Sequence, residues 1–386
     1  MRVLFVIDSL WGGGTERSLA DMLPYLDRIG LTSLVACLHR RAGGVEAEVR
    51  NHGTRVHFLP GGGMLTQVRA LRRLIREFAP DVVHSSLFRA DLVARLARVG
   101  VAPVLINSLV NTTYGSARLA DASLSRRRVR LAQAIDVVTG RLLVDHFHAV
   151  SEAAKLAAIR DQRLPSERIT VARRGRDAQR LGTPSHERRS IARRALGISD
   201  EAVVLVNVAR QDPQKGQVHL VDAFALLAHR HPTLLLLVAG REGSASSRLA
   251  AAVDRRAIRE QVRFLGHRDD VPDILAASDI FVFPSLWEGY PGAVLEAMAL
   301  GLPVVAADIP PTREIVHGDT GALVPPGDHR ALADTLERLI ADRSLRQSMG
   351  SAARRCFNER HTMEACARSM VELYAAVLQH KSSQVP

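Results

Sequence analysis

One pattern recurs along this chain: a short apolar strand, a turn and a helix with one apolar face. Arg2–Ile7 has the pattern of an apolar strand, and 15–30 that of a helix whose leucines and methionine share one face. VVLVNVA at 203–209 restarts the alternation after a polar stretch. Such alternation is typical of parallel sheets with helices on both faces. We predict an α/β protein built from two doubly wound, Rossmann-like sheets.

The length of the chain also favours two domains. Its 386 residues exceed what one hydrophobic core usually fills. The stretch from about 183 to 200 is polar and arginine-rich, which is typical of a linker. We expect a first domain at 1–182, a second at 183–360, and a helix at 361–386 that packs back on the first. Ligands of open α/β sheets bind at the carboxyl ends of the strands, so an interdomain cleft is the expected site.

The amino-acid composition limits the class of protein and the cellular compartment that we expect. Apolar residues at 47% and charged residues at 24% are ordinary globular values. The longest apolar run, Leu234–Ala239, is far shorter than the roughly 20 residues of a spanning helix. The amino terminus meets Asp8 and then glycines without a cleavage pattern, so it reads as a strand and not a signal peptide. Cys37, Cys356 and Cys366 lack C-x-x-C spacing, which indicates a reducing, cytoplasmic compartment and argues against zinc.

Residues 284–308, PSLWEGYPGAVLEAMALGLPVVAAD, form the sharpest motif. Pro291 is expected at the first position of a helix, where the N–H groups of Gly292 and Ala293 would make an anion site. Glu288 precedes this helix start and Glu296 lies in its second turn. Two carboxylates would repel a phosphate but would suit the hydroxyls of a sugar and a ribose beside it. Two merely solvated glutamates would not account for this context.

A second motif, ARQDPQKGQ at 209–217, directly follows an apolar strand. Arg210 and Lys215 bracket a turn that contains Pro213 and closes at Gly216. Arginine offers a planar fork and lysine a compact charge, a pairing suited to the oxygens of a diphosphate. Taken alone, the motif would be equally compatible with two solvated loop cations.

A third motif, WGGGTER at 11–17, follows the first strand. Its three glycines would let the backbone approach a ligand, and Thr15 is a candidate N-cap. The spacing is not that of the G-x-G-x-x-G fingerprint, so a simple tight turn is an equal alternative.

Together these residues resemble the GT-B glycosyltransferases of the large retaining family 4. Gly13 to Arg17 is similar to that family's first loop, and Arg210 with Lys215 to its R-x(n)-K-G diphosphate pair. Glu288 to Glu296 matches its E-x7-E motif, and GLPVVAAD at 301–308 is similar to the next strand. The resemblance covers nearly the whole chain and is strongest from Val203 to Pro326.

The resemblance implies a nucleoside diphosphate sugar held mainly by the second domain, with the acceptor on the side of the first. Arg210 and Lys215 would stabilise the diphosphate as leaving group, and Glu288 would hold the donor sugar at the catalytic centre. Glu296 would accept hydrogen bonds from the ribose, and the segment Phe264–Arg268, which contains Gly266, would contact the base. Neither a metal nor a cofactor is implied, and front-face displacement is the implied route. The donor-binding positions implied are Gly13, Gly14, Arg210, Lys215, Gly266, Gly289, Tyr290, Gly292, Ala293 and Glu296.

The sequence departs from the family pattern in the first domain. Many relatives carry a histidine after the strand that corresponds to Val104–Ser108, where this chain has Asn111. An asparagine can orient a hydroxyl but cannot take its proton at neutral pH. His84 and His148 end strands, where a packed histidine is more common than a catalyst. Arg174–Gly175 replaces the usual Asn–Gly near the domain crossover, which predicts an altered hinge loop.

The chain carries 52 lysines and arginines against 40 acids, a net charge of +12. The segment Leu124–Arg130 holds four arginines, and 163–194 holds ten. Solvated faces are the simpler interpretation. The sharper one is that the first segment, a helix with Leu124, Val129 and Leu131, presents charge to anionic lipid headgroups. Nucleic acid is disfavoured because aromatic residues are only 4% and no stacking motif accompanies the arginines.

We therefore expect a retaining, metal-independent hexosyltransferase that takes a sugar from UDP or GDP. Its acceptor would be a glycan or a lipid-linked sugar in envelope or exopolysaccharide synthesis. The enzyme would be cytoplasmic or peripheral on the inner face of the plasma membrane. Two alternatives remain: a sugar-nucleotide epimerase of the same fold, and a degenerate protein that binds nucleotide sugars without catalysis.

Overall fold

The computed structural model describes residues 1–11, 13–112, 114–115 and 125–383, and of Arg126 the backbone alone. The predicted turn glycine Gly12 and the predicted apolar Leu124 lie outside the described residues. Met1–Arg176 together with Met363–Pro386 form one compact unit, and Asp177–Thr362 form a second. In the described part of the chain, no helix is long and apolar enough to cross a membrane.

The sheet of the first unit, as far as the structure describes it, has seven parallel strands in the order β3-β2-β1-β4-β5-β6-β7. About six were expected, and the additional β7 has only three residues, too few to show a period. The strands are β1 (Arg2–Ile7), β2 (Thr32–Cys37), β3 (Arg55–Phe58), β4 (Val82–Ser86), β5 (Val104–Leu109), β6 (His146–Ala149) and β7 (Ile169–Val171).

Helices cover both faces of this sheet, as the burial of β1 shows. Val3, Phe5 and Ile7 point to one face and Leu4 and Val6 to the other, and all five are buried. The helices of this unit are α1 (Gly14–Arg28), α2 (Glu46–Asn51), α3 (Met64–Phe78), α4 (Phe88–Arg98), α6 (Arg126–Leu143), α7 (Glu152–Gln162) and α17 (Met363–Ser382).

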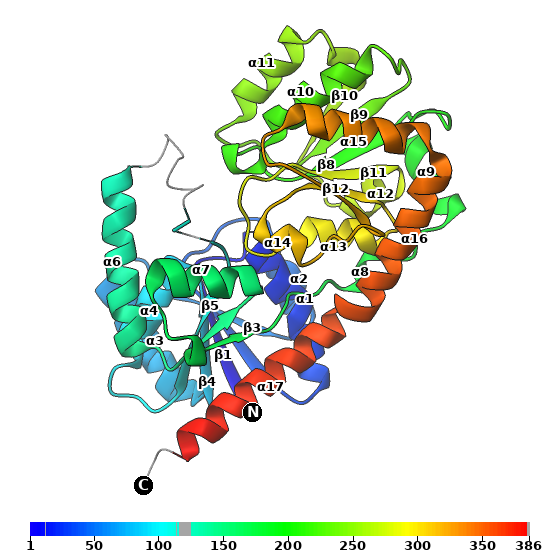
Figure 1. Ribbon diagram of the computed structural model, residues 1–386. Helices are drawn as coiled ribbons and strands as arrows, with labels where there is room; N and C mark the ends of the chain where they lie inside the picture. The colour runs from blue at the N-terminus through cyan, green and yellow to red at the C-terminus, as the bar shows by residue number, and fades with distance from the viewer. Residues whose placement is uncertain (12, 113, 116–124, 384–386) are drawn as a thin grey trace. The chain divides into compact units, whose positions relative to one another are not determined.

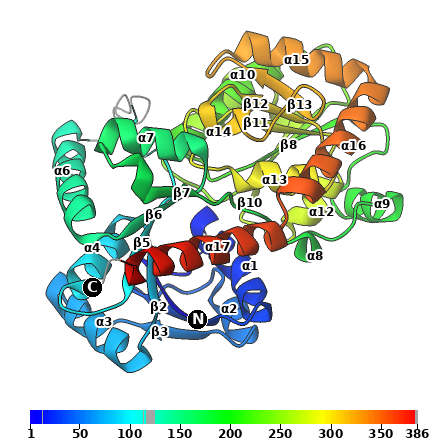
Figure 2. The same cartoon turned by 60° about the horizontal axis from the view of Figure 1, so that its bottom comes forward.

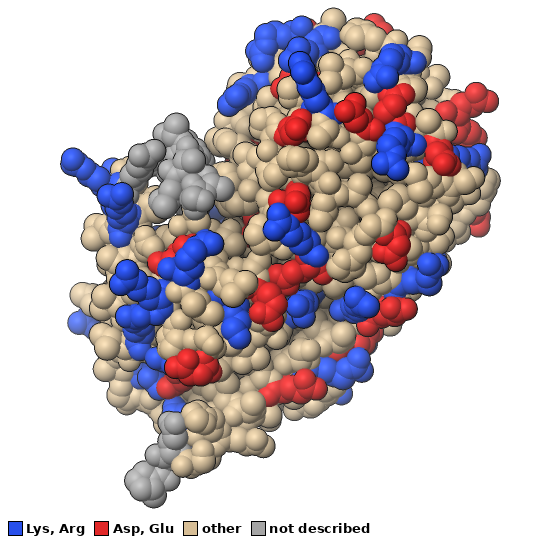
Figure 3. Space-filling view, in the orientation of Figure 1, with Lys and Arg blue, Asp and Glu red and all other residues tan. Residues whose placement is uncertain are grey.

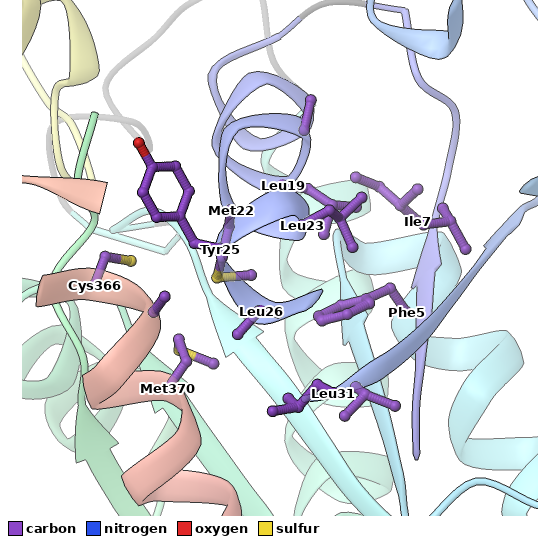
Figure 4. Close-up of a cluster of buried hydrophobic side chains, with 14 of the residues drawn as sticks. Phe5, Ile7, Leu19, Met22, Leu23, Tyr25, Leu26, Leu31, Cys366 and Met370 are labelled. Carbon is purple, nitrogen blue, oxygen red and sulfur yellow. The ribbon is translucent and has the colours of Figure 1, made fainter. Parts of the chain in front are cut away.

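The C-terminal helix α17 is part of the first unit's core. It lies along α1, the helix that follows the first strand (Figure 2). Cys366 and Met370 of α17 lie beside Met22 and Tyr25 of α1 (Figure 4). The last segment of the chain therefore completes a core that the first segment begins.

The second unit contains a parallel sheet whose described strands follow the order β10-β9-β8-β11-β12-β13 (Figure 1). Its strands are β8 (Val204–Val208), β9 (Leu235–Ala239), β10 (Val262–Gly266), β11 (Ile280–Phe283), β12 (Val304–Ala307) and β13 (Gly321–Val324). Its helices are α8 (Ala178–Leu181), α9 (His186–Ala195), α10 (Gln217–Ala228), α11 (Ser246–Arg255), α12 (Val271–Ala276), α13 (Gly292–Ala299), α14 (Pro310–Arg313), α15 (His329–Ala341) and α16 (Arg343–Arg360).

The arginine-rich stretch predicted as a linker is the helix α9, so that prediction was wrong. Ser185 caps α9 by accepting a hydrogen bond from Arg188 N. Arg193 is buried, and its guanidinium donates to Ala277 O at 3.0 Å and to Asp279 Oδ2 at 2.8 Å. Carbonyl and carboxylate acceptors satisfy the buried cation, which is why an arginine-rich segment can pack in the second unit.

The boundary between the units lies between Arg176 and Asp177, six residues before the expected 182/183. Asp177 caps the short helix α8 by accepting from the backbone N–H groups of Gln179 and Arg180. Arg180 in turn reaches Glu296 on α13, which holds α8 in the second unit. The second boundary, expected at 360/361, lies between Thr362 and Met363.

Candidate functional site

The candidate site of the second unit lies where its strand order reverses. β8 and β11 are neighbours although three helices and two strands separate them in the chain. Such a switch point separates the loops at the carboxyl ends of two adjacent parallel strands, where open α/β sheets bind ligands. Here the loop 209–216 follows β8 and the loop 284–291 follows β11.

Backbone and side-chain contacts tie these two loops together. Leu286 N donates to Gln214 O at 2.8 Å, and Gln214 Nε2 donates to Trp287 O at 2.6 Å. Gly216 has a φ of +62°, and a Cβ at this position would lie 2.1 Å from Pro284 O. Only glycine permits both this backbone conformation and this close approach. The two loops therefore form one hydrogen-bonded surface at the strand ends.

Lys215 and Glu288, predicted separately as catalytic residues, form an ion pair. Lys215 Nζ lies 2.6 Å from Glu288 Oε1, and the side chains keep only 19% and 10% of their exposure. The ammonium cancels the charge of a shielded carboxylate that would otherwise be costly to bury. A carboxylate neutralised in this way can lie near a diphosphate without repelling it.

Arg210 extends from the same surface with most of its side chain in solvent. Its guanidinium forms an ion pair with Asp212, and 56% of the side chain is exposed. Asp212 Oδ1 also accepts from Ser244 N at 3.2 Å, which links the loop to the one that follows β9. Asp212 thus orients the arginine while leaving it accessible. The sequence reasoning missed this residue although it lies inside the ARQDPQKGQ motif.

The start of α13 differs by one position from the prediction. Pro291 is the N-cap, with φ −77° and ψ 103°, and Gly292 is the first helical residue. Pro291 was expected inside the helix, but its extended ψ keeps it outside. The N–H groups of Gly292 and Ala293 still fall in the first turn, where no intrahelical acceptor is available and the helix dipole is positive.

Glu296 lies on α13 and is held by an arginine that sequence reasoning missed. Its Oε1 is 3.3 Å from Arg180 Nη2, and its side chain is 12% exposed. Tyr290 is buried, and its hydroxyl lies 3.1 Å from Nδ1 of His361. The tyrosine therefore helps fix the loop that carries Glu288 and Gly289, and its role in ligand binding stays a prediction.

Gly266 ends β10, two strands away from β8. It has a φ of +64° and lies at a register shift against β9. Its carbonyl accepts from Gly240 N at 2.8 Å. The positive φ favours glycine at this strand end, while contact with a base stays a prediction.

The glycine loop of the first unit leads directly into α1. Gly13 is the N-cap without a side-chain cap, and Gly14 is the first helical residue. Thr15 does not cap the helix, contrary to the prediction. Its Oγ1 instead accepts from Arg174 Nη2 at 3.0 Å, so the predicted hinge arginine is bound to the first turn of α1.

Two family descriptions match the chain in succession. The description "Glycosyltransferase Family 4" matches residues 12–180, and "Glycosyl transferases group 1" matches residues 188–356. The chain belongs to these GT-B glycosyltransferases.

Known proteins similar to this glycosyltransferase include both curated sequences and solved structures. The UDP-Gal:alpha-D-GlcNAc-diphosphoundecaprenol alpha-1,3-galactosyltransferase of Escherichia coli is 25% identical over 72% of this chain and 70% of its own. The D-inositol 3-phosphate glycosyltransferase of Jonesia denitrificans is 29% identical over 76% of this chain and 71% of its own. The structure of Anabaena HepE in complex with UDP and glucose aligns with a TM-score of 0.85 at 25% identity, covering 97% and 100% of the two chains.

In the first unit of the glycosyltransferase, the two strand-end histidines belong to a buried chain of hydrogen bonds. Its heavy-atom distances are 2.7 Å from Tyr374 Oη to His84 Nδ1 and 2.7 Å from His84 Nε2 to Ser108 Oγ. The next hydrogen bond joins Ser108 Oγ to His148 Nδ1 at 3.0 Å, and the last joins His148 Nε2 to Ala172 O at 2.8 Å. Sequence reasoning missed Tyr374 because it lies 290 residues from His84.

The last hydrogen bond of this series determines which atom donates in each of the others. Ala172 O can only accept, so His148 Nε2 carries a proton and its Nδ1 accepts from the Ser108 hydroxyl. His84 Nε2 must then donate to Ser108 Oγ, and the Tyr374 hydroxyl donates to His84 Nδ1. Burial lowers the pKa of His148 to about 4 and the pKa of His84 well below its usual range. Both histidines are therefore neutral at pH 7, and each ring nitrogen has a hydrogen-bond partner inside the unit. That they are packed side chains and not catalysts stays a prediction.

Asn111 of the glycosyltransferase lies just beyond β5. Its Oδ1 accepts from the backbone N–H of the next residue, Thr112, at 2.8 Å. Among the described residues, no group of three or more His, Cys, Asp or Glu side chains converges as metal ligands would.

Proposed function

We propose that this glycosyltransferase takes a sugar from a nucleoside diphosphate sugar and transfers it with retention of configuration. The observation that carries the proposal is the tied pair of loops after β8 and β11. They bring Arg210, Lys215, Glu288 and the start of α13 to the carboxyl ends of two adjacent strands. The complex of Anabaena HepE with UDP and glucose supports a donor of this class.

Arg210, Lys215 and the start of α13 would hold the diphosphate. Two cations and the N–H groups of Gly292 and Ala293 supply positive charge where negative charge grows as the diphosphate departs. These groups provide leaving-group stabilisation from the protein itself, which is why we propose a metal-independent reaction.

Glu288 and Glu296 would bind hydroxyls on either side of the diphosphate. Lys215 neutralises Glu288 and Arg180 partly neutralises Glu296, so each carboxylate can accept hydrogen bonds near an anion. We assign the donor sugar to Glu288 and the ribose to Glu296, as the family resemblance implies.

The proposed reaction is a front-face displacement. The bond from the anomeric carbon to the phosphate oxygen breaks, and a bond to the acceptor oxygen forms on the same face. The acceptor proton passes to the departing phosphate, so no side-chain base is required at Asn111. An ion-paired Glu288 is a weak nucleophile, which favours this route over a covalent intermediate.

We propose a glycan or lipid-linked sugar as acceptor, in envelope or exopolysaccharide synthesis. The name of the Escherichia coli relative contains a lipid-linked sugar diphosphate, and that of the Jonesia denitrificans relative contains an inositol phosphate. The three free cysteines in the described chain suit a reducing compartment, so we place the reaction in the cytoplasm.

A two-step experiment tests the proposal. Thermal-shift screening of UDP-, GDP- and ADP-sugars identifies the donor, because a ligand that binds only the folded protein raises its stability. Release of the nucleoside diphosphate is then measured with and without cell-envelope glycolipid acceptors. We expect release that depends on the acceptor, and a drop of about 100-fold or more in Arg210→Ala and Glu288→Gln.

Two control variants match these substitutions, and two results would support the alternative functions. Arg259 and Glu260 are exposed residues of the same unit, so Arg259→Ala and Glu260→Gln should keep activity within about two-fold. Formation of an epimeric nucleotide sugar without acceptor would identify an epimerase instead. Donor binding without turnover for every acceptor would identify a non-catalytic binding protein.

A further inference from the structure

Helix α6 of the first unit exposes large apolar side chains. Leu131, Ile135, Val138 and Leu142 are 63%, 40%, 55% and 74% exposed. A helix at the surface of a globular unit normally turns such residues toward the core. An exposed group of this size indicates an interaction surface. We call these four residues the α6 stripe.

The α6 stripe is continuous. Its members are spaced by four, three and four residues, so they share one face of the helix within an arc of about 60°. The stripe extends about 17 Å along the axis. The apolar residues expected on this helix beside the arginines were Leu124, Val129 and Leu131. Leu124 lies outside the described residues, Val129 is only partly exposed, and Leu131 alone belongs to the stripe.

Contacts on the opposite face of α6 hold the helix in an orientation that leaves the α6 stripe exposed to solvent. Asp136 Oδ1 lies 2.7 Å from Arg95 Nη1, and the buried Gly140 lets the helix approach Arg95 and Phe147. Gln133 Nε2 donates to Asp161 O at 2.7 Å. Rotation of the helix to bury its leucines would break these contacts. Exposure of the stripe is therefore built into the unit.

Positive charge borders the α6 stripe. Arg127, Arg128, Arg130 and Arg141 are exposed on the same helix, and Asp136, its single acid, faces inward to Arg95. Lys and Arg side chains gather over α6 in the space-filling view (Figure 3). An apolar stripe with cationic borders matches an interface that has an apolar interior and an anionic surface.

We propose that the α6 stripe docks this protein on an anionic lipid bilayer. The helix would lie parallel to the surface, with the stripe among the acyl chains and the arginines at the phosphates. A second copy of the chain is a poorer occupant, because pairing two stripes would bring two sets of arginines together. This surface uses none of the residues assigned to the donor, so it stands independently of the proposed reaction.

Vesicle flotation of the full chain tests this surface. Wild-type protein should float with phosphatidylcholine vesicles that contain about 30% phosphatidylglycerol and remain below with pure phosphatidylcholine. Replacement of Arg127, Arg128 and Arg130 by glutamine should weaken binding by about 100-fold, at about five-fold for each arginine. A second variant with serine at Leu131, Val138 and Leu142 should bind at least about 10-fold more weakly even at low salt.

A matched variant separates the stripe from general charge. Arg69, Arg73 and Arg76 are exposed on α3 of the same unit, and their replacement by glutamine removes the same charge. This control should float nearly as well as wild type, while UDP binding and circular dichroism verify the fold of all variants. Equal flotation of all variants, or no flotation of wild type, would overturn the proposal. Concentration-dependent dimers lost only in the serine variant, without lipid binding, would assign the stripe to self-association instead.

Discussion

Breaking the ion pair between Lys215 and Glu288 offers a direct test of how the candidate site is built. A separation of 2.6 Å gives about 6 kcal/mol of gross Coulomb attraction at an effective dielectric of about 20. Desolvation offsets most of this, since the side chains keep only 19% and 10% of their exposure. We expect a net coupling of about 1–3 kcal/mol, between the values for exposed and buried pairs.

A double-mutant cycle measures that coupling. The variants are Lys215→Met, Glu288→Gln and their combination, in a Trp11→Phe background. Trp287 is then the single remaining tryptophan and reports urea unfolding of the second unit. Each single variant should lose about 2 kcal/mol, because it leaves an unpaired charge in a shielded site. The double variant should lose clearly less than the sum.

Donor binding gives the second readout of the same cycle. Lys215→Met should weaken UDP binding by about 10- to 100-fold through loss of a charged hydrogen bond to the diphosphate. Glu288→Gln should leave UDP affinity within a few-fold while sugar transfer falls. Strictly additive stabilities would refute the pairing, and unchanged UDP affinity in Lys215→Met would refute its role at the diphosphate.

Three further changes test the packing around the sites. Gly216→Ala should destabilise the second unit by at least about 1 kcal/mol, because of the left-handed backbone and the nearby carbonyl; a neutral result in urea unfolding would count against it. Tyr374→Phe removes the donor to His84 and should cost the first unit about 1–3 kcal/mol, with unchanged UDP affinity as the control. Burial lowers the pKa of His148 to about 4, so the unfolded chain binds the proton more readily than the folded one. The free energy of unfolding therefore decreases as the pH is lowered. The share of this loss that His148 contributes should begin near pH 6.5 and reach at most about 3 kcal/mol near pH 4, in addition to the share of His84, whose pKa is also lowered; a His148→Gln variant should show a flatter thermal-stability profile over that range.

Much of the second unit could be predicted from sequence because its signals are local. The motifs at 209–217 and 284–308 each combine an apolar strand, a glycine or proline turn and a charged side chain within a few residues. The position of Pro291 was wrong by one because neighbouring φ values at a helix start are alike and only ψ distinguishes them. The prediction that Thr15 caps a helix was wrong, because its hydroxyl accepts a hydrogen bond from Arg174, which is far away in the chain.

Partners that are distant in sequence could not be predicted. Lys215 and Glu288 are 73 residues apart, and Arg180 and Glu296 are 116 apart. Each pair forms because sheet order or helix docking places two segments side by side. The arginine-rich stretch at 183–200 failed as a linker for the same reason, since buried acceptors for Arg193 lie on other segments.

Periodicity and turn chemistry are local properties, so the amino-acid sequence was enough to predict the two parallel sheets, the family and a set of residues suited to a diphosphate. The charges that neutralise one another and the leucines of α6 that remain in solvent emerged from the folded units. Pairing and burial depend on the group that packs opposite a side chain. That group is chosen by the fold of the whole unit and not by neighbours along the chain.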